Sequence, residues 1–146
     1  MPEHKGLLLD LEHVVTGAKP RIETQGLSAR CSIAHGDFFV AVSEGDTYIM
    51  KNIIHDWNDE RSTTILKNIH RASRPGSRVI LLEAVISPGN EPHFAKWIDI
   101  EMLLLPCGRQ RTKQEYRELF AATGFKMSKV VPTKSPLCVI EAVREN

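Results

Sequence analysis

Short apolar segments alternate with segments of helical pattern along most of this chain, and that alternation restricts its fold more than any other feature. The segments expected to be strands, rich in aliphatic residues, are 6–10, 31–34, 47–51 and 78–86. The segments expected to be helical are 11–18, a stretch from Pro20 to near Gly26, 59–72 and 94–105. Because strands that alternate with helices are typical of βαβ units, we predict an α/β fold with a mostly parallel sheet.

The C-terminal part is expected to form one helix followed by two strands. Thr112 is placed to cap that helix, Glu115 completes a capping box, and Gly124 suits its C-terminal end. The two strands expected next are 126–132 and 137–143. Since only a short segment separates them, we expect an antiparallel pair at the C-terminal edge of the sheet.

Length and composition indicate an ordinary globular protein. A chain of 146 residues with 42% hydrophobic and 25% charged residues fits one domain, residues 1–146. A net charge of +1 gives no reason to expect binding to nucleic acid or to an acidic membrane. Cys31, Cys107 and Cys138 lack C-x-x-C spacing, so neither a disulfide framework nor a structural metal site is expected. Without a signal pattern or a membrane-spanning apolar run, a cytoplasmic setting is expected.

A histidine follows the expected strand 47–51, at the strand end where ligands bind in open α/β sheets. His55 precedes Asp56 and Trp57, and Lys51 lies four residues before it. A lone histidine is more often structural than catalytic, and no second histidine lies at a spacing that suits a metal site. Its pKa near 6.5 makes the alternative, a general base, chemically reasonable.

Two acidic residues lie at expected strands. Glu83 interrupts the apolar strand 78–86, where a carboxylate costs several kcal/mol unless it is paired or hydrogen-bonded. It is either a neutral, hydrogen-bonded buried acid or an acid that orients His55. Asp10 closes the first strand, where an acid suits either a helix N-terminus or hydrogen bonding to ribose hydroxyls.

Three segments resemble those of the small-molecule O-methyltransferases that use S-adenosylmethionine, of the plant caffeic-acid and bacterial polyketide-tailoring type. They are Gly36-Asp37-Phe38-Phe39, the Lys51-to-Trp57 segment with its Lys-x-x-x-His-Asp-Trp order, and Gly108-Arg109-Gln110-Arg111-Thr112. The resemblance runs from about residue 6 to the C-terminus. It implies methyl transfer from S-adenosylmethionine to a hydroxyl of a small aromatic compound.

The resemblance also implies roles for individual residues. His55 would be the general base, Glu83 would orient it, and Gln110 stands where the family usually has a second flanking glutamate. Four residues would contact the cofactor: Asp10 the ribose, Asp37 and Phe38 the adenine, and Lys51 a neighbouring part. A turn role for Asp37 and a core role for Phe38 remain the alternatives. Asp99 and Met102 would line the substrate pocket, with core packing as the alternative for Met102.

The glycine-rich segment Asp-x-Gly-Gly-Gly-x-Gly of this family has no counterpart in the sequence. The chain therefore resembles the C-terminal half to two-thirds of a catalytic domain, a partial Rossmann-like class I methyltransferase sheet with its first strand missing. In the family that strand lies between the strands that match 6–10 and 47–51. Its absence would leave two strand edges without partners, so we expect a homo-oligomer.

Two functions follow from these expectations. The first is an O-methyltransferase or a remnant of one. The alternative is a non-catalytic fragment of that fold that self-associates or binds a small hydrophobic ligand. A Rossmann dehydrogenase is disfavoured because no G-x-G-x-x-G opens a helix.

Overall fold

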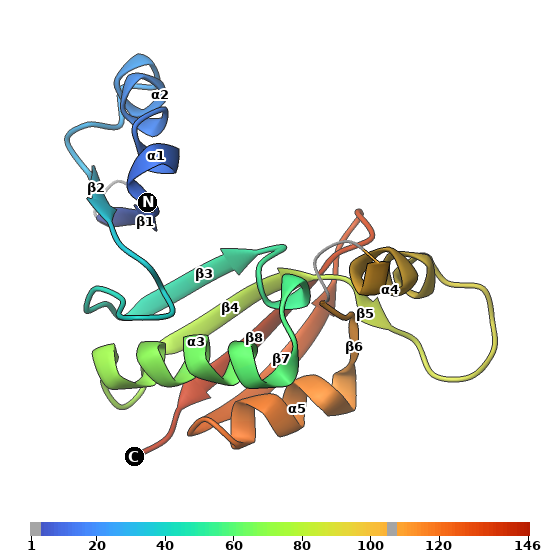
Figure 1. The fold of residues 1–146 in the computed structure, drawn as a ribbon. Coiled ribbons are helices and arrows are strands. Elements are labelled where there is room, and N and C mark those ends of the chain that lie inside the picture. The colour runs from blue at the N-terminus through green and yellow to red at the C-terminus, as the bar shows by residue number, and fades with distance from the viewer. Residues whose placement is uncertain (1–3, 105–107) are drawn as a thin grey trace. The chain divides into compact units, whose positions relative to one another are not determined.

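The computed structural model describes residues 4–104 and 108–146, and the chain divides into two compact units, Met1–Ser43 and Glu44–Asn146. The first unit holds two parallel strands, β1 (Gly6–Asp10) and β2 (Cys31–His35), paired so that Asp10 lies opposite His35. Two short helices connect these strands, α1 (Glu12–Val15) and α2 (Ala18–Thr24). The unit is thus a single small βαβ crossover, coloured blue in Figure 1.

The second unit is built on a four-stranded sheet with the order β3-β4-β8-β7. β3 (Thr47–Lys51) runs parallel to β4 (Arg78–Glu83). β8 (Cys138–Arg144) runs antiparallel both to β4 and to β7 (Phe125–Pro132). The antiparallel pair expected from the sequence is confirmed, and β7 forms one edge of this sheet.

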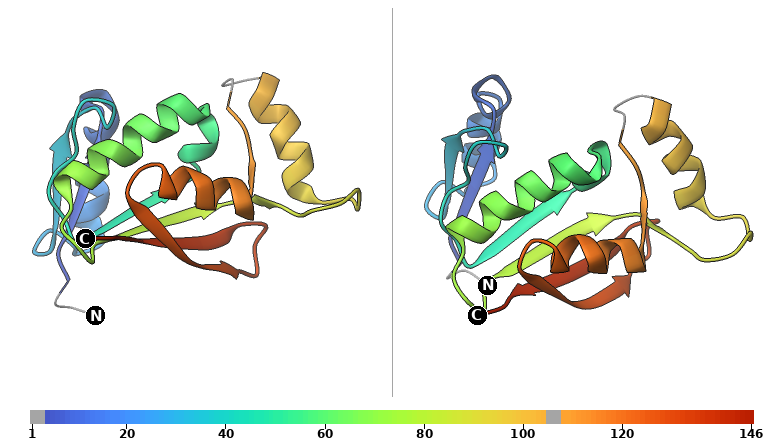
Figure 2. Two further views of the ribbon diagram at one scale, coloured as in Figure 1. Left: turned by 90° about the horizontal axis from the view of Figure 1, so that it is seen from below. Right: turned by 60° about the horizontal axis from the view of Figure 1, so that its bottom comes forward.

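Helices α3 (Asp59–Ala72) and α5 (Lys113–Ala121) lie across one face of this sheet (Figures 1 and 2). The core forms between them and the sheet, from Ile65, Leu66, Ile69, Val79, Leu81, Phe120, Phe125, Ile140 and Ala142. The register places Val79 opposite Ala142 and Leu81 opposite Ile140. Since alternate residues of a strand share a face, Glu83 is the next member of this buried row. The strand period itself therefore buries the Glu83 carboxyl group.

Three short elements complete the second unit beyond the end of β4. They are the 3₁₀ turn η1 (Ile54–Asp56) and the two-residue parallel strands β5 (Val85–Ile86) and β6 (Arg111–Thr112). Helix α4 (Phe94–Leu104) follows β5. The segment 78–86, expected as one strand, is thus two, because β5 leaves the main sheet to pair with β6.

Other element boundaries differ from expectation by small amounts. The first helix covers only Glu12–Val15 of the expected 11–18, and the second begins at Ala18 rather than Pro20. The expected end of α4 at Leu105, together with Cys107, lies outside the described residues. α5 ends at Ala121, and Gly124 follows with a φ of 82°, the left-handed conformation that favours glycine.

The capping box of α5 is confirmed: Thr112 accepts a hydrogen bond from the Glu115 amide, and Glu115 accepts one from the Thr112 amide. The α/β class is also confirmed, with parallel pairings in β1–β2, β3–β4 and β5–β6. That residues 1–146 form one domain stays a prediction. Among residues 4–104 and 108–146, no helix is long and apolar enough to cross a membrane.

Candidate functional site

A tight turn carries His55 away from the carboxyl end of β3. Asn52, the first residue after the strand, has a φ of 52°, a left-handed conformation that asparagine adopts more readily than most residues. Its amide donates to the carbonyl of Leu82 on β4 at 3.2 Å, and the chain then enters η1. The backbone reversal at Asn52 therefore places His55 beside the last residues of β4.

Glu83 holds the first residues of that turn. Its side chain is completely buried, and its Oε1 accepts hydrogen bonds from the amides of Ile53 at 3.1 Å and Ile54 at 2.9 Å. Burial raises the pKa of Glu83 to about 7, and the backbone donors of the turn oppose this rise. These amides are the compensation that a carboxyl group on an apolar strand requires.

The His55 imidazole lies among three polar side chains. Its Nδ1 is 2.6 Å from Gln110 Nε2 and 3.5 Å from Glu83 Oε2, and its Nε2 is 3.2 Å from Asp56 Oδ1. The side chain is only 12% exposed. Burial lowers the pKa of His55, which the nearby Asp56 carboxylate counteracts and the Arg111 guanidinium reinforces. The lowered pKa favours the neutral ring, which is able to accept a proton.

The Gln110 amide decides which ring nitrogen of His55 is basic. An NH₂ group directed at Nδ1 requires the ring proton on Nε2, whereas an amide oxygen at that place accepts from Nδ1–H and leaves Nε2 basic. Among the described residues, Gln110 Oε1 and Glu83 Oε2 are buried atoms without a hydrogen-bond partner. Turning the amide over would give Gln110 Oε1 a donor, the Nδ1–H group of His55.

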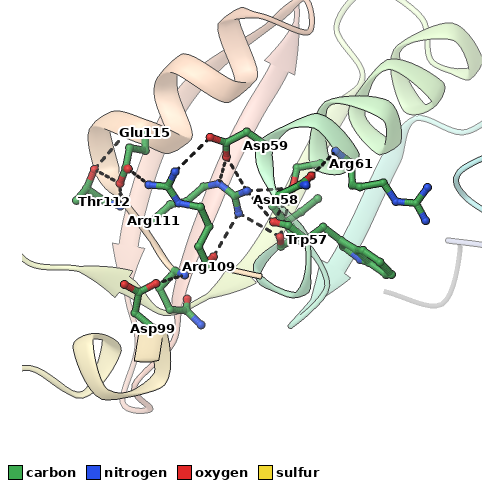
Figure 3. Close-up of polar contacts among 12 residues, drawn as sticks. Trp57, Asn58, Asp59, Arg61, Asp99, Arg109, Arg111, Thr112 and Glu115 are labelled. Carbon is green, nitrogen blue, oxygen red and sulfur yellow. Dashed lines mark hydrogen bonds and ion pairs between the residues drawn. The ribbon is translucent and has the colours of Figure 1, made fainter. Parts of the chain in front are cut away.

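Arg111 holds the other side of the turn from within the protein (Figure 3). Its side chain is completely buried, and its Nη atoms donate to the carbonyls of Ile54 at 3.1 Å and Trp57 at 2.9 Å. The same guanidinium donates to Asp59 Oδ1 at 2.8 and 3.0 Å and to Ser62 Oγ at 3.1 Å. One cation thus links β6, η1 and the start of α3.

The segment before β6 approaches the His55 backbone closely. The Arg109 amide donates to the His55 carbonyl at 2.9 Å. A Cβ atom on Gly108 would lie 2.1 Å from that carbonyl oxygen, so only glycine fits at this position. Arg109 also pairs with Asp59 and Glu115 near the surface, as Figure 3 shows.

The residues predicted to line a substrate pocket contact this same segment. Asp99 Oδ1, on α4, accepts a hydrogen bond from the Gln110 amide at 2.7 Å. The Met102 carbonyl accepts one from the Gly108 amide at 3.0 Å, and the Met102 side chain is half-buried. Asp99 thus holds the Gln110 backbone directly, and Met102 holds the backbone two residues before it. The role of both residues toward a substrate stays a prediction.

The residues predicted to contact a cofactor fall in both units. In the first, Asp10 ends β1 and Asp37 follows the adjacent parallel strand β2, and the Gly36 amide donates to the Asp10 carbonyl at 2.9 Å. Each carboxylate accepts from a nearby backbone amide, Asp10 from Leu11 and Asp37 from Phe39, both at 2.8 Å. Phe38 is half-buried, with its ring 4.8 Å from that of Phe39. Lys51, exposed at the end of β3, belongs to the second unit.

Sequence reasoning gave no role to Arg111, Asp59 or Gly108, which hold the turn that carries His55. Arg111 appeared only as a member of the segment from Gly108 to Thr112. A possible signal was an arginine beside Gln110 directly before a capped helix, although surface arginines occur in the same pattern. No group of three or more His, Cys, Asp or Glu side chains in the described residues could hold a metal ion.

Comparison with known proteins identifies a related family. Residues 1–126 match the model of the O-methyltransferase domain. Phenazine O-methyltransferase PhzM of Lysobacter antibioticus is 43% identical over 142 residues, which are 97% of this chain and 42% of the relative. (R,S)-reticuline 7-O-methyltransferase of Papaver somniferum is 36% identical over 152 residues, covering 99% of this chain and 40% of the relative.

Solved structures give the same result. The crystal structure of LaPhzM superposes with a TM-score of 0.93 at 42% identity, over 99% of this chain and 44% of that one. NcsB1 from neocarzinostatin biosynthesis, in complex with S-adenosyl-L-homocysteine and 1,4-dihydroxy-2-naphthoic acid, gives 0.86 at 29% identity, over 96% and 42%. The chain thus spans less than half the length of the relatives it matches. Its partial methyltransferase-like sheet is that of the matching portion.

Proposed function

The chain belongs to the family of O-methyltransferase domains, and we propose that it forms part of an enzyme that methylates a hydroxyl group of a small aromatic compound. The observation that carries this proposal is the group of His55, Glu83 and Gln110 beyond the carboxyl ends of β3 and β4. The relatives support the class of acceptor, since one is named for a phenazine and another binds a dihydroxynaphthoic acid. S-adenosylmethionine, present in a second NcsB1 structure, is the proposed methyl donor.

His55 is the proposed general base. A phenol has a pKa near 10 and histidine near 6.5, so complete deprotonation before the reaction would cost roughly 5 kcal/mol at ~1.4 kcal/mol per unit. The lowered pKa of His55 widens this gap. Proton transfer to His55 while the acceptor oxygen attacks the methyl group avoids most of that cost. General-base assistance of this kind contributes about two to four orders of magnitude in rate.

Glu83 and Gln110 prepare the imidazole for this step. With the Gln110 amide turned over, Oε1 accepts from Nδ1–H, and Nε2, which lies 3.2 Å from Asp56 Oδ1, is unprotonated and can take the proton of the acceptor. The resulting imidazolium is stabilised by the Glu83 carboxyl group, whose Oε2 lies 3.5 Å from Nδ1. Because Gln110 carries no charge, Glu83 is the one acidic side chain on the Nδ1 side among the described contacts of His55.

The first unit is proposed to bind the adenosine part of the donor. Asp10 and Asp37 lie where ligands bind in parallel α/β sheets, and their carboxylates suit ribose hydroxyls and the adenine amino group. The half-buried Phe38 ring offers an apolar surface to the base. Lys51 is proposed to lie near the donor. When bound, S-adenosylmethionine supplies a methyl group on a positively charged sulfur.

A chimera tests the proposal directly. It replaces the segment of PhzM that matches this chain with residues 1–146, and methylation of the PhzM substrate is followed by mass spectrometry. We expect activity, and His55→Ala should lower turnover by about two or more orders of magnitude with little change in donor affinity. His13→Ala, at an exposed histidine of α1, is the matched control. An unchanged rate constant for His55→Ala would remove His55 from the mechanism, and a folded but inactive chimera would contradict the assigned activity.

A non-catalytic, self-associating fragment is the alternative, and one surface favours it. Helix α4 exposes large apolar side chains, of which Trp97 is 70% exposed, and the others are Phe94, Ile100, Leu103 and Leu104. Contiguous apolar surface of this kind marks association sites or ligand grooves. A folded, inactive chimera together with a dimeric isolated chain would select this alternative.

A further inference from the structure

Two buried ionisable side chains, the acid Glu83 and the base Arg111, hold the turn that carries His55. Glu83 Oε1 accepts from the amides of Ile53 and Ile54, where the turn begins. Arg111 donates to the carbonyls of Ile54, the first residue of η1, and of Trp57, the residue that follows η1. Between these contacts the Arg109 amide satisfies the His55 carbonyl, and the Asp56 and Trp57 amides close the 3₁₀ turn. The position of the imidazole is thereby determined from outside the turn.

The geometry of this cluster requires an arginine. Burying a cation is costly unless its donors are satisfied, and Arg111 directs its donors to three backbone carbonyls, Asp59 and Ser62. A lysine ammonium carries the same charge, but it cannot reproduce the planar, multiply donating fork of a guanidinium. Asp59 alone would compensate the charge of Arg111, so the additional hydrogen bonds to the carbonyls and to Ser62 serve another purpose.

We propose that Arg111 is a positioning residue, which sets the location of the His55 imidazole by holding the carbonyls of Ile54 and Trp57. The inference rests on the proposed function only in assigning His55 as the base. Arg111 acts through the backbone of the turn, because its guanidinium donates to the carbonyls of Ile54 and Trp57, which flank His55 in the sequence.

A second effect of Arg111 acts on the proton affinity of His55. The charged or titratable groups that face the imidazole are Asp56 on its own turn, Glu83 on β4 and Arg111 on β6. The Arg111 guanidinium lowers the pKa of His55, so removing its charge raises that pKa. Position and charge can be separated because Arg111→Lys retains the charge while Arg111→Gln removes it.

Amide hydrogen exchange and NMR titration of the full 146-residue chain test the proposal. In Arg111→Lys, exchange at the Asp56 and Trp57 amides should quicken about tenfold, because the carbonyls of Ile54 and Trp57 lose the guanidinium as a donor. Amides of β4 and β8, which report global unfolding, should change less. His55 should titrate at higher pH in Arg111→Gln than in Arg111→Lys. Arg109→Lys, at a more exposed arginine of the same segment, should leave the turn amides unchanged.

A milder variant covers the case in which Arg111→Lys does not fold. Asp59→Ala removes an exposed partner of the guanidinium, and the turn amides should still exchange about threefold faster. Glu60→Ala controls for loss of an acid in the first turn of α3. Turn amides and a His55 pKa that match the wild type in both Arg111→Lys and Asp59→Ala would overturn the proposal. None of these measurements requires methyl transfer, so they are independent of the chimera experiment.

Discussion

At the scale of single residues, the unusual position is Gln110. It contacts His55 Nδ1 at 2.6 Å, where the resemblance to O-methyltransferases would place a glutamate. An amide can orient the ring but cannot add negative charge. The imidazolium that forms on proton transfer therefore lies between two acidic side chains, Asp56 near Nε2 and Glu83 near Nδ1, and burial raises the pKa of Glu83 to about 7. Two predictions follow from this division of roles.

Restoring a carboxylate at position 110 should raise the pKa of His55. In Gln110→Glu an anion lies beside Nδ1, and a nearby anion stabilises the protonated ring. NMR titration of the His55 ring protons measures the shift. Gln114→Glu makes the same change at an exposed position of α5 and should leave His55 unaffected. Equal His55 titration in both variants would show that residue 110 does not act on the imidazole in solution.

Glu83 should make stability depend on pH. Its folded pKa of about 7 exceeds the ordinary 4.5, so the folded state holds this proton more tightly than the unfolded state. Its contribution is fully present below pH 4.5 and is lost as pH rises through about 7, by up to about 3 kcal/mol. Urea unfolding between pH 5 and about 8 should show this loss in the wild type and a smaller one in Glu83→Gln. Identical pH profiles would mean that Glu83 ionises normally. The lowered pKa of His55 acts in the opposite direction, and NMR titration of His55 in both proteins separates its contribution from that of Glu83.

At the scale of elements, the site tolerates the least change where the segment before β6 approaches the backbone of η1. Gly108→Ala would place a Cβ atom 2.1 Å from the His55 carbonyl oxygen, so one of the two segments must move. We expect a loss of about 1–3 kcal/mol in unfolding free energy and altered His55 ring shifts. Gly45→Ala, where the added Cβ meets only ordinary contacts with Tyr48, is the matched control. Unchanged ring shifts of His55 in Gly108→Ala would show that Gly108 and the His55 carbonyl lie farther apart in solution than in the structure.

The elements themselves were largely predictable, and the contacts between them were not. Periodicity located β1, β3 and α3 at their observed bounds, because each follows from local patterns of apolar residues. The division of 78–86 at Ala84 was missed, since it depends on the pairing of β5 with a strand that lies far along the chain. Arg111 was missed for the same reason. Arg111 can be buried because carbonyls of a turn far along the chain accept its hydrogen bonds, and the sequence around Arg111 gives no sign of that turn.

At the scale of the whole molecule, the strand edges raise the question of association. Among the described strands, β1 pairs only with β2, and β3 pairs only with β4. Each therefore has one edge without a strand partner, and such edges template pairing with other chains. The relatives contain more than twice the length matched here, since this chain covers 42% of PhzM. A polypeptide of these 146 residues is thus expected to behave differently from a longer enzyme.

The last prediction concerns donor binding by the 146-residue polypeptide. Asp10, Asp37 and Phe38 can contact the adenosine part, but no segment of this sequence matches the glycine-rich loop that would hold the methionine part. We expect S-adenosylmethionine to bind weakly, near millimolar at best, which is about −4 kcal/mol. We also expect no appreciable methylation of phenols, and self-association through the strand edges.

Isothermal titration of the purified polypeptide, with its mass measured by size exclusion and light scattering, tests both expectations. PhzM and the chimera, measured under the same conditions, give the affinity that a longer protein reaches. Asp37→Asn should weaken even the residual binding, because the proposed acceptor for the adenine amino group loses its charge. Micromolar binding by a monomer would contradict both parts, since another segment of these 146 residues would then have to hold the methionine part of the donor.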